Sequence, residues 1–148
     1  MTVALKQQSM TFVTNQTALR AMKIAIATED FENVAGHAGQ SSRWLLYDCK
    51  SPNEIGAATR VMLMRDQVFH HWLDNGPHPL DGVDIMVARS AGDGFLRRME
   101  NRGVSVLLTG ETLAEMALLK ILAGEALPDP RWDASLVLCR IRDLFSRH

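Results

Sequence analysis

The feature that most constrains the fold is a short apolar run, Lys23-Ile24-Ala25-Ile26-Ala27-Thr28. Polar residues do not alternate with apolar ones in this run, which is the pattern of a β-strand covered on both faces. Such a strand lies in the middle of a sheet that carries packing layers on each side. Because the chain has 148 residues, about the size of one ordinary domain, we expect a single α/β core.

The remaining apolar segments predict four more strands and several helices. The predicted strands span residues 43–49, 58–64, 83–88 and 104–108, and the helices span 66–73, 95–101 and, from a Thr112–Glu115 capping box to Gly124, 112–123. Short turns between the first three strands favour antiparallel pairing, and the strand-turn-helix order after residue 83 favours parallel strands with right-handed crossovers. The sequence therefore predicts a mixed five-stranded sheet with helices on both faces.

The two ends of the chain differ from this core. Residues 1–21 are mixed, rich in Thr and Gln, and lack the basic-then-apolar order of a signal peptide, and we interpret them as a mobile N-terminal extension. Residues 22–127 form the predicted α/β domain. Residues 128–148 predict a C-terminal amphipathic helix, with apolar positions at Trp132, Leu136, Ile141, Leu144 and Phe145.

Composition narrows the possible partners. The formal net charge is -1, so no global basic field favours nucleic acid, and no segment approaches the roughly 20 apolar residues of a membrane span. Cys49 and Cys139 lie inside apolar stretches, as reduced and buried cysteines do, and no Cys-x-x-Cys is present. We expect a cytoplasmic protein that binds neither nucleic acid nor membrane and cannot build a thiolate cage alone.

Two glycine-bearing loops follow strands of the predicted sheet, at residues 29–40 and 89–94. If those strands are parallel neighbours, both loops open at one edge of the sheet, where ligands of open α/β sheets bind. The free N–H groups at the start of the following helix favour an anion. A tight strand-helix turn without a ligand explains the same glycines equally well. The candidate binding residues are Gly36, His37, Gly39, Ser90, Gly92, Asp93 and Gly94.

His37 is the candidate metal ligand, because it lies between Gly36 and Ala38-Gly39 and its imidazole is free to approach a ligand. A lone loop histidine is more often a surface residue. His70 and His71 are adjacent on the predicted helix and point about 100° apart, which favours a surface or capping role. His78, between Pro77 and Pro79, could face the same site as His37.

Catalytic patterns are weak. Four aspartates, Asp30, Asp48, Asp84 and Asp93, could gather metals as a two-metal nuclease does, but no glutamate at a supporting spacing accompanies Asp48 or Asp84. The chain lacks the nucleophile motif G-x-S-x-G and the phosphate-binding motif G-x-x-x-x-G-K. Arg97 also stands where a dinucleotide-binding loop would have its third glycine. We expect no catalytic residues.

Taken together, these motifs resemble a known family. They are Met22 to Thr28, Val34 with Gly36-His37-Ala38-Gly39, Trp44 to Asp48, Asp81 to Val87, Gly92-Asp93-Gly94 and Arg102 to Val106. The chain resembles the dinitrogenase iron-molybdenum cofactor biosynthesis family, which includes the NifX and NafY-like carriers and the C-terminal domain of NifB. The resemblance implies a ribonuclease H-like fold without nuclease activity.

The resemblance also implies a ligand and its partners. In the family the loop after the first strand typically has His-Phe-Gly, whose histidine is implicated in cofactor binding and corresponds to His37; Ala38 replaces the Phe. Many members have a cysteine where this chain has Asp81-Gly82, so no thiolate comes from that position. The implied role is a non-enzymatic carrier or accessory protein that binds an iron–sulfur cofactor precursor and contacts nitrogenase assembly proteins.

Two descriptions of the ligand remain open. An anionic cluster precursor would be held by His37, the helix N–H groups and a nearby arginine, for which Arg43, Arg89 and Arg97 are the candidates. The alternative is a metal-free module that binds a small anionic metabolite or a partner protein in the same cleft.

Overall fold

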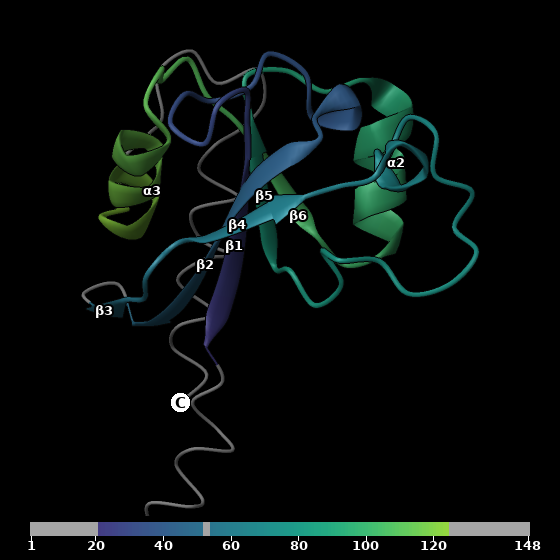
Figure 1. The fold of residues 1–148 in the computed structure, drawn as a ribbon. Coiled ribbons are helices and arrows are strands. Elements are labelled where there is room, and N and C mark those ends of the chain that lie inside the picture. The colour runs from purple at the N-terminus through teal and green to yellow at the C-terminus, as the bar shows by residue number, and fades with distance from the viewer. Residues whose placement is uncertain (1–20, 52–53, 125–148) are drawn as a thin grey trace, which may run out of the picture.

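A computed structural model describes residues 21–51 and 54–124. Within these ranges the chain forms one mixed sheet with an α-helix on each face (Figure 1). The strands are β1 (Met22–Thr28), β2 (Arg43–Ser51), β3 (Glu54–Ile55), β4 (Thr59–Met62), β5 (Ile85–Ala88) and β6 (Ser105–Leu108). The helices are α2 (Asp93–Asn101) and α3 (Ala114–Leu122), with 3-10 turns η1 (Ala38–Gln40) and η2 (Arg65–Gln67). The predicted C-terminal helix and all but Ala21 of the predicted extension lie outside the described residues.

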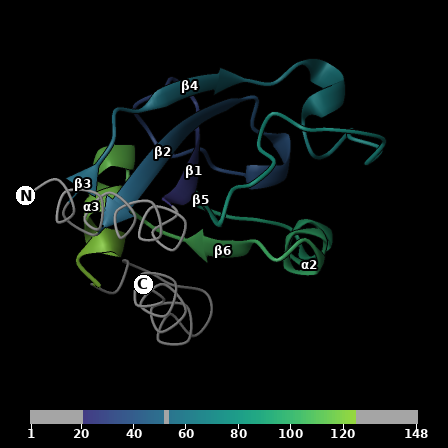
Figure 2. The ribbon, with the colours of Figure 1, turned by 90° about the horizontal axis from the view of Figure 1, so that it is seen from below.

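The sheet combines antiparallel and parallel pairing, as predicted. β2 pairs antiparallel with β1, whereas β1, β5 and β6 run parallel to one another. Figure 2 shows β4, β2, β1, β5 and β6 in this order across the sheet. The predicted count of five strands is wrong, because the chain returns along β2 in two pieces, β3 and β4. Gly56 lies between the two pieces, and its N–H donates to the carbonyl of Asp48. A Cβ at Gly56 would lie only 2.8 Å from that carbonyl oxygen, so this close crossing requires glycine.

Side chains of β1 alternate between two apolar cores, which explains why its sequence lacks polar alternation. Ile24 and Ile26 face the core that includes α3, whereas Ala25 and Ala27 face the core that includes Met99 of α2. Both isoleucines are fully buried. The prediction of a central strand covered on both faces, with helices on both sides, is therefore confirmed.

The helix predicted for residues 66–73 does not form. Within residues 63–83, the only helical turn is η2, and the rest of this segment is irregular chain laid over the same face as α2. The spacing of Val68 and Trp72 reflects burial in that layer and not a helix face. The N–H of His70, which a helix would bond to its own fourth-preceding carbonyl, donates instead to the carbonyl of Gly39 at 2.8 Å. A tertiary contact has replaced the local helix.

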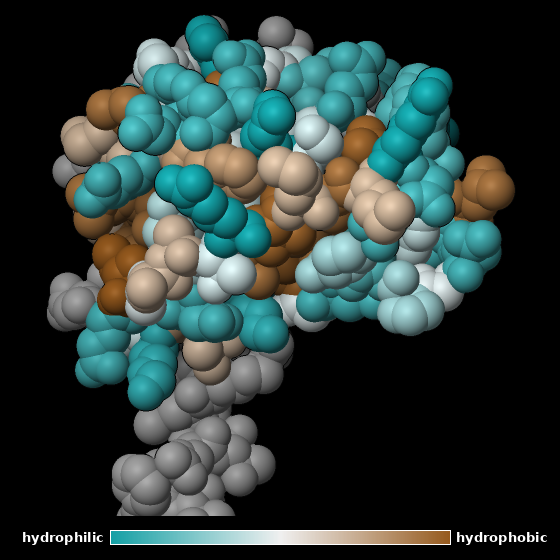
Figure 3. Space-filling view, in the orientation of Figure 1, coloured by the Kyte–Doolittle hydropathy of each residue, from teal (hydrophilic) through white to brown (hydrophobic). Residues whose placement is uncertain are grey.

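The capping box predicted for α3 is also absent. The helix begins at Ala114 with Leu113 at the N-cap position, and no side chain caps it. The N–H of Ala114 donates instead to the carbonyl of Glu32, so the loop after β1 provides a backbone partner at the start of the helix. Leu113, Met116 and Leu119 are exposed, and Figure 3 shows brown apolar surface over the region of α3.

Both α-helices of the described ranges have nine residues, too few to cross a bilayer, which takes about 20.

Candidate functional site

The two glycine-bearing loops meet at one edge of the sheet, as predicted from the order of the strands. Because β1 and β5 are parallel neighbours, the chain leaves both at the same end. Three hydrogen bonds join the loops: Ala38 N–H donates to Ser90 O at 3.0 Å, Arg89 N–H donates to Ala35 O at 3.0 Å, and the Ser90 hydroxyl donates to Gly36 O. The two loops therefore form one connected surface.

An open cleft of about 430 Å³ lies beside this junction. Four of the predicted site residues line it: His37, Gly39, Gly92 and Gly94. The other three, Gly36, Ser90 and Asp93, adjoin the cleft in the chain without lining it. Gly36 and Ser90 join the loops to each other, and Asp93 occupies the first turn of α2, where a carboxylate stabilises the helix.

The His37 side chain is exposed at the cleft, although Ala38 and Gly39, which follow it, are buried. A Cβ placed on Gly39 would lie 3.7 Å from both Nδ1 and Cε1 of the His37 ring and 3.9 Å from the Phe95 ring. The imidazole thus lies beside the bare backbone of Gly39, which also borders the Phe95 side chain of α2. Its metal-ligating role remains a prediction.

The N-terminus of α2 forms the opposite side of the cleft. Gly92 is its N-cap, no side chain caps it, and the first bond of the helix runs from Leu96 N–H to Gly92 O. The N–H groups of Asp93, Gly94 and Phe95 therefore have no partner within the helix. A Cβ at Gly94 would meet nothing within 4 Å, so packing does not require glycine there. Because Gly94 has no side chain, its backbone is open to a ligand.

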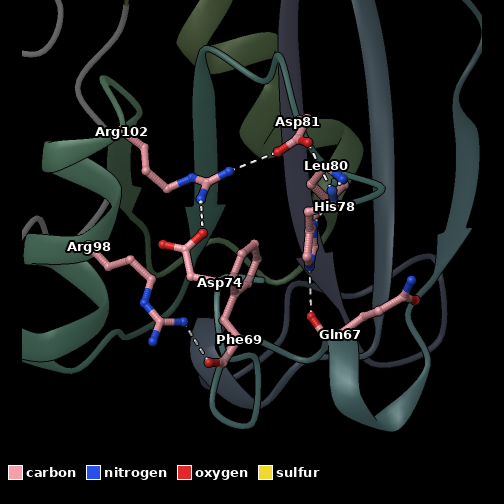
Figure 4. Close-up of polar contacts among 8 residues, drawn as sticks. All are labelled: Gln67, Phe69, Asp74, His78, Leu80, Asp81, Arg98 and Arg102. Carbon is pink, nitrogen blue, oxygen red and sulfur yellow. Dashed lines mark hydrogen bonds and ion pairs between the residues drawn. The ribbon is translucent and has the colours of Figure 1, made fainter. Parts of the chain in front are cut away.

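Five further residues, which were not among the predicted site residues, line the cleft: Gln40, Phe69, His70, Phe95 and Arg98. Arg98 is half-buried, and its Nη1 donates to the carbonyl of Phe69 at 3.0 Å (Figure 4). Its i, i+4 spacing from Gly94 is a signal that could have indicated it. Phe69 and His70 carry no such signal, since only the fold brings them to the cleft. No acidic residue of the described ranges lines the cleft.

The aromatic side chains of the cleft come from Phe69 and Phe95 and not from position 38, where the family's His-Phe-Gly pattern has its Phe. The Ala38 side chain is fully buried in the core and does not line the cleft. The rings of Phe69 and Phe95 meet edge to face, with centroids 5.5 Å apart, and both line it. Loss of the Phe at position 38 therefore does not leave the cleft without aromatic side chains.

His78 does not face this cleft, and that prediction was wrong. It is buried, with Nε2 2.7 Å from the carbonyl oxygen of Gln67 and Nδ1 accepting from Leu80 N–H at 3.0 Å (Figure 4). Its ring stacks on Phe69 at 4.5 Å and borders a second cavity of about 300 Å³. Arg102 lines that cavity and pairs with Asp74 and Asp81 at 2.9 and 2.8 Å. His78 therefore holds the 63–83 segment in place.

The three arginines that the sequence suggested as anion-binding candidates do not line the cleft, whereas Arg98 does. Arg43 donates to the carbonyl of Glu29, and neither Arg89 nor Arg97 lines the cleft. The loop that holds Arg89 runs along the sheet edge, and Arg97 is exposed on α2 one residue before Arg98. One residue along a helix rotates a side chain by about 100°, which is why Arg98 and not Arg97 reaches the site.

The four aspartates considered for a nuclease do not gather. Asp48 pairs in register with Lys23 at the start of β1, and Asp84 Oδ2 accepts from Lys23 N–H at 2.9 Å. Asp30 follows the end of β1 and Asp93 follows the end of β5, at the opposite edge of the sheet. Within residues 21–51 and 54–124, no group of three or more His, Cys, Asp or Glu could hold a metal ion.

Cys49 is not available as a ligand. It is buried on β2, and burial, reinforced by the negative charge of Asp48, raises the pKa of its thiol to about 11. The prediction of a reduced, buried cysteine is confirmed at this position. Cys139 lies outside the described residues.

Comparison with known proteins decides the family. The sequence model of the dinitrogenase iron-molybdenum cofactor family matches residues 20–124. The chain belongs to this family. Membership confirms the resemblance drawn from the residues and connects the chain with the iron-molybdenum cofactor of dinitrogenase. No curated protein sequence matches the chain.

Solved structures agree with this family at the level of the fold. One is the crystal structure of a protein from Methanocaldococcus jannaschii that is named after dinitrogenase. It superposes on this chain with a TM-score of 0.55 at 9% identity, and the alignment covers 71% of this chain and 91% of that one. The protein PH0822 gives a TM-score of 0.56 at 19% identity, covering 77% and 98%. An NMR structure of the jannaschii protein gives 0.56, also at 9% identity, covering 74% and 93%. These matches support the mixed α/β fold of the family member described here.

Proposed function

We propose that this chain is a non-enzymatic carrier or accessory protein of nitrogenase cofactor assembly, and that it binds an iron–sulfur precursor in the His37 cleft. The observation that carries the proposal is the pairing of an exposed imidazole with the bare N-terminus of α2 across an open cleft, which no acidic residue of the described part of the chain lines. Membership of the iron-molybdenum cofactor family supports this cargo over other anions.

The residues of the cleft suit a preassembled, anionic cluster. Imidazole nitrogen is a ligand for iron, and His37 presents one at the cleft. The N–H groups of α2 and the guanidinium of Arg98 favour negative charge, while Phe69 and Phe95 offer apolar contact to sulfide. A bare metal ion would need three or four protein donors, which the described residues do not bring together.

Weak attachment suits a protein that must pass its cargo on. The described part of the chain offers no accessible thiolate, so the cluster would not be fixed in the way that thiolate cages fix their iron. The proposal includes the finer features implied by the family: a ribonuclease H-like domain over residues 22–127, a cytoplasmic location, and contacts with nitrogenase assembly proteins.

An anaerobic titration tests the proposal. A synthetic four-iron, four-sulfur cluster with small thiolate caps is added to the full chain, and binding is followed by visible absorption and by iron and sulfide content after gel filtration. We expect saturation at one cluster per chain and at least a tenfold weaker affinity for His37→Ala. His71→Ala, which changes an exposed histidine that does not line the cleft, is the matched control.

Unchanged absorption on mixing, or full binding by His37→Ala, would overturn the cluster carrier. If the cleft instead binds a small anion without metal, inorganic phosphate will bind with an affinity that depends on Arg98 and not on His37.

A further inference from the structure

The geometry points to His70 as a second ligand, so that the cleft holds its cluster between two imidazoles carried by separate segments of the chain. This inference rests on the proposed function, because it assigns the ligand set of the same cleft. The two histidines lie 33 positions apart in the sequence. They line one cleft only because the irregular 63–83 segment crosses the sheet edge beside the loop that carries His37.

The backbone around His70 is held from two directions. Its N–H donates to the carbonyl of Gly39 at 2.8 Å, which ties it to the turn that follows His37. The preceding carbonyl, that of Phe69, accepts from Arg98 of α2 at 3.0 Å. His70 is thus anchored to both walls of the cleft, a fixed position of the kind that a metal ligand requires.

The side chain of His70, in contrast, is exposed and lines the cleft. Among residues 21–51 and 54–124 its ring has no hydrogen-bond partner that would account for its orientation, whereas the buried His78 has both ring nitrogens within bonding distance of the backbone. Exposed imidazole nitrogen is available to a ligand. A structural role comparable to that of His78 does not explain His70.

Its neighbour His71 shows that position, and not residue type, singles out His70. Both histidines are exposed, and their rings lie 5.1 Å apart at 76°. His71 does not line the cleft. The chain therefore contains a matched pair of adjacent histidines, of which one lines the cleft and the other does not.

Two imidazoles suit a cluster better than a single ion. A multi-iron cluster exposes several iron atoms, so each histidine can bind a different iron without meeting the other at one metal. A second ligand strengthens the otherwise weak attachment through His37, and it stays exchangeable because it is a neutral nitrogen donor. Movement of the 63–83 segment would then alter cluster affinity directly.

Nitrogen spectroscopy on the loaded protein counts the ligands. The full chain, labelled with 15N at histidine, is loaded anaerobically with the synthetic four-iron, four-sulfur cluster, reduced, and examined by pulsed electron paramagnetic resonance. We expect two histidine nitrogen couplings in the wild type and in His71→Ala, and one in His70→Ala. We also expect cluster affinity to fall at least tenfold in His70→Ala and to recover in His70→Cys, which restores a ligand.

The outcomes separate this inference from the proposed function. Absence of cluster binding by the wild type would overturn both. If His37→Ala loses binding while His70→Ala keeps wild-type affinity and couplings, His70 is not a ligand and the carrier proposal stands. Equal losses in His70→Ala and His71→Ala would also overturn the inference, because they would indicate a general effect of the histidine pair. Circular dichroism of each variant checks that the fold is retained.

Discussion

Cys49 provides a quantitative test of the fold, because its buried thiol links stability to pH. The side chain is fully buried on β2, among residues of the core that includes α3. Burial raises its pKa from an ordinary value of 9.0 to about 11, with the charge of Asp48 acting in the same direction. The thiol therefore stays protonated in the folded chain over a range in which it ionises in the unfolded chain.

The sign and size of the effect follow from this difference. Because the folded pKa is raised, the stability linked to Cys49 is fully present below pH 9 and is lost as the pH rises toward and through 11. At 1.36 kcal/mol per unit, the loss in the free energy of unfolding is about 2 kcal/mol by pH 11 and approaches about 3 kcal/mol above it. A loss of that size is a large part of the stability of a small domain.

Urea denaturation between pH 8 and pH 11, monitored by tryptophan fluorescence, measures this loss in the free energy of unfolding. The comparison is between Cys139→Ser and the double variant Cys139→Ser, Cys49→Val, so that Cys49 is the only thiol that differs. Tyr47, whose pKa is raised mainly by burial and then by the charge of Glu115, is present in both proteins; the smaller contribution of Cys49 to that pKa is absent from the double variant and forms part of the measured difference. We expect the single variant to lose about 2 kcal/mol more than the double variant on going to pH 11. Parallel pH profiles, or rapid alkylation of Cys49 by iodoacetamide in the folded protein at pH 8, would refute the reasoning.

Three further substitutions test the site region by urea denaturation at pH 7. Ala38→Phe, which introduces the family's aromatic residue into a fully buried position, is expected to destabilise the fold by about 1–3 kcal/mol; unchanged stability with tighter cluster binding would mean that position 38 faces the cleft. Gly103→Ala is expected to cost about 1 kcal/mol, because Gly103 has φ +76 at the end of α2. Gly94→Ala, inside α2 with no neighbour to meet the new Cβ, is expected to stabilise the fold by about 0.5 kcal/mol while weakening cluster binding; a loss of stability there would contradict the open-space reasoning.

Much of the fold could be predicted because its signals are local. The apolar run of β1 indicates a strand covered on both faces, and the helical stop at Gly103 indicates where α2 ends. The order of elements after residue 83 indicates the parallel strands β5 and β6. Periodicity and turn chemistry act over a few residues, so the sequence carries them directly.

The 63–83 segment shows where local signals fail. Its apolar spacing predicts a helix, yet the N–H of His70 bonds to Gly39, and Phe69 packs against Trp44, Trp72 and Phe95. Apart from the local contact with Trp72, these contacts join residues that are distant in sequence, and they outweigh a weak helical preference. Strand β3 was not predicted for the same reason: it forms only through its pairing with β2, which depends on the path of the chain across the sheet.

The candidate site divides in the same way. The sequence by itself determined the two glycine loops, the exposed His37 and their meeting at one sheet edge, because strand order and backbone freedom fix where loops open. Only the tertiary structure decided that Arg98, His70 and the two phenylalanines complete the cleft and that Ala38 turns into the core. The physical reason is that the segments packed beside a cleft form its walls. Packing between segments that are distant in sequence cannot be predicted from the local pattern of either segment.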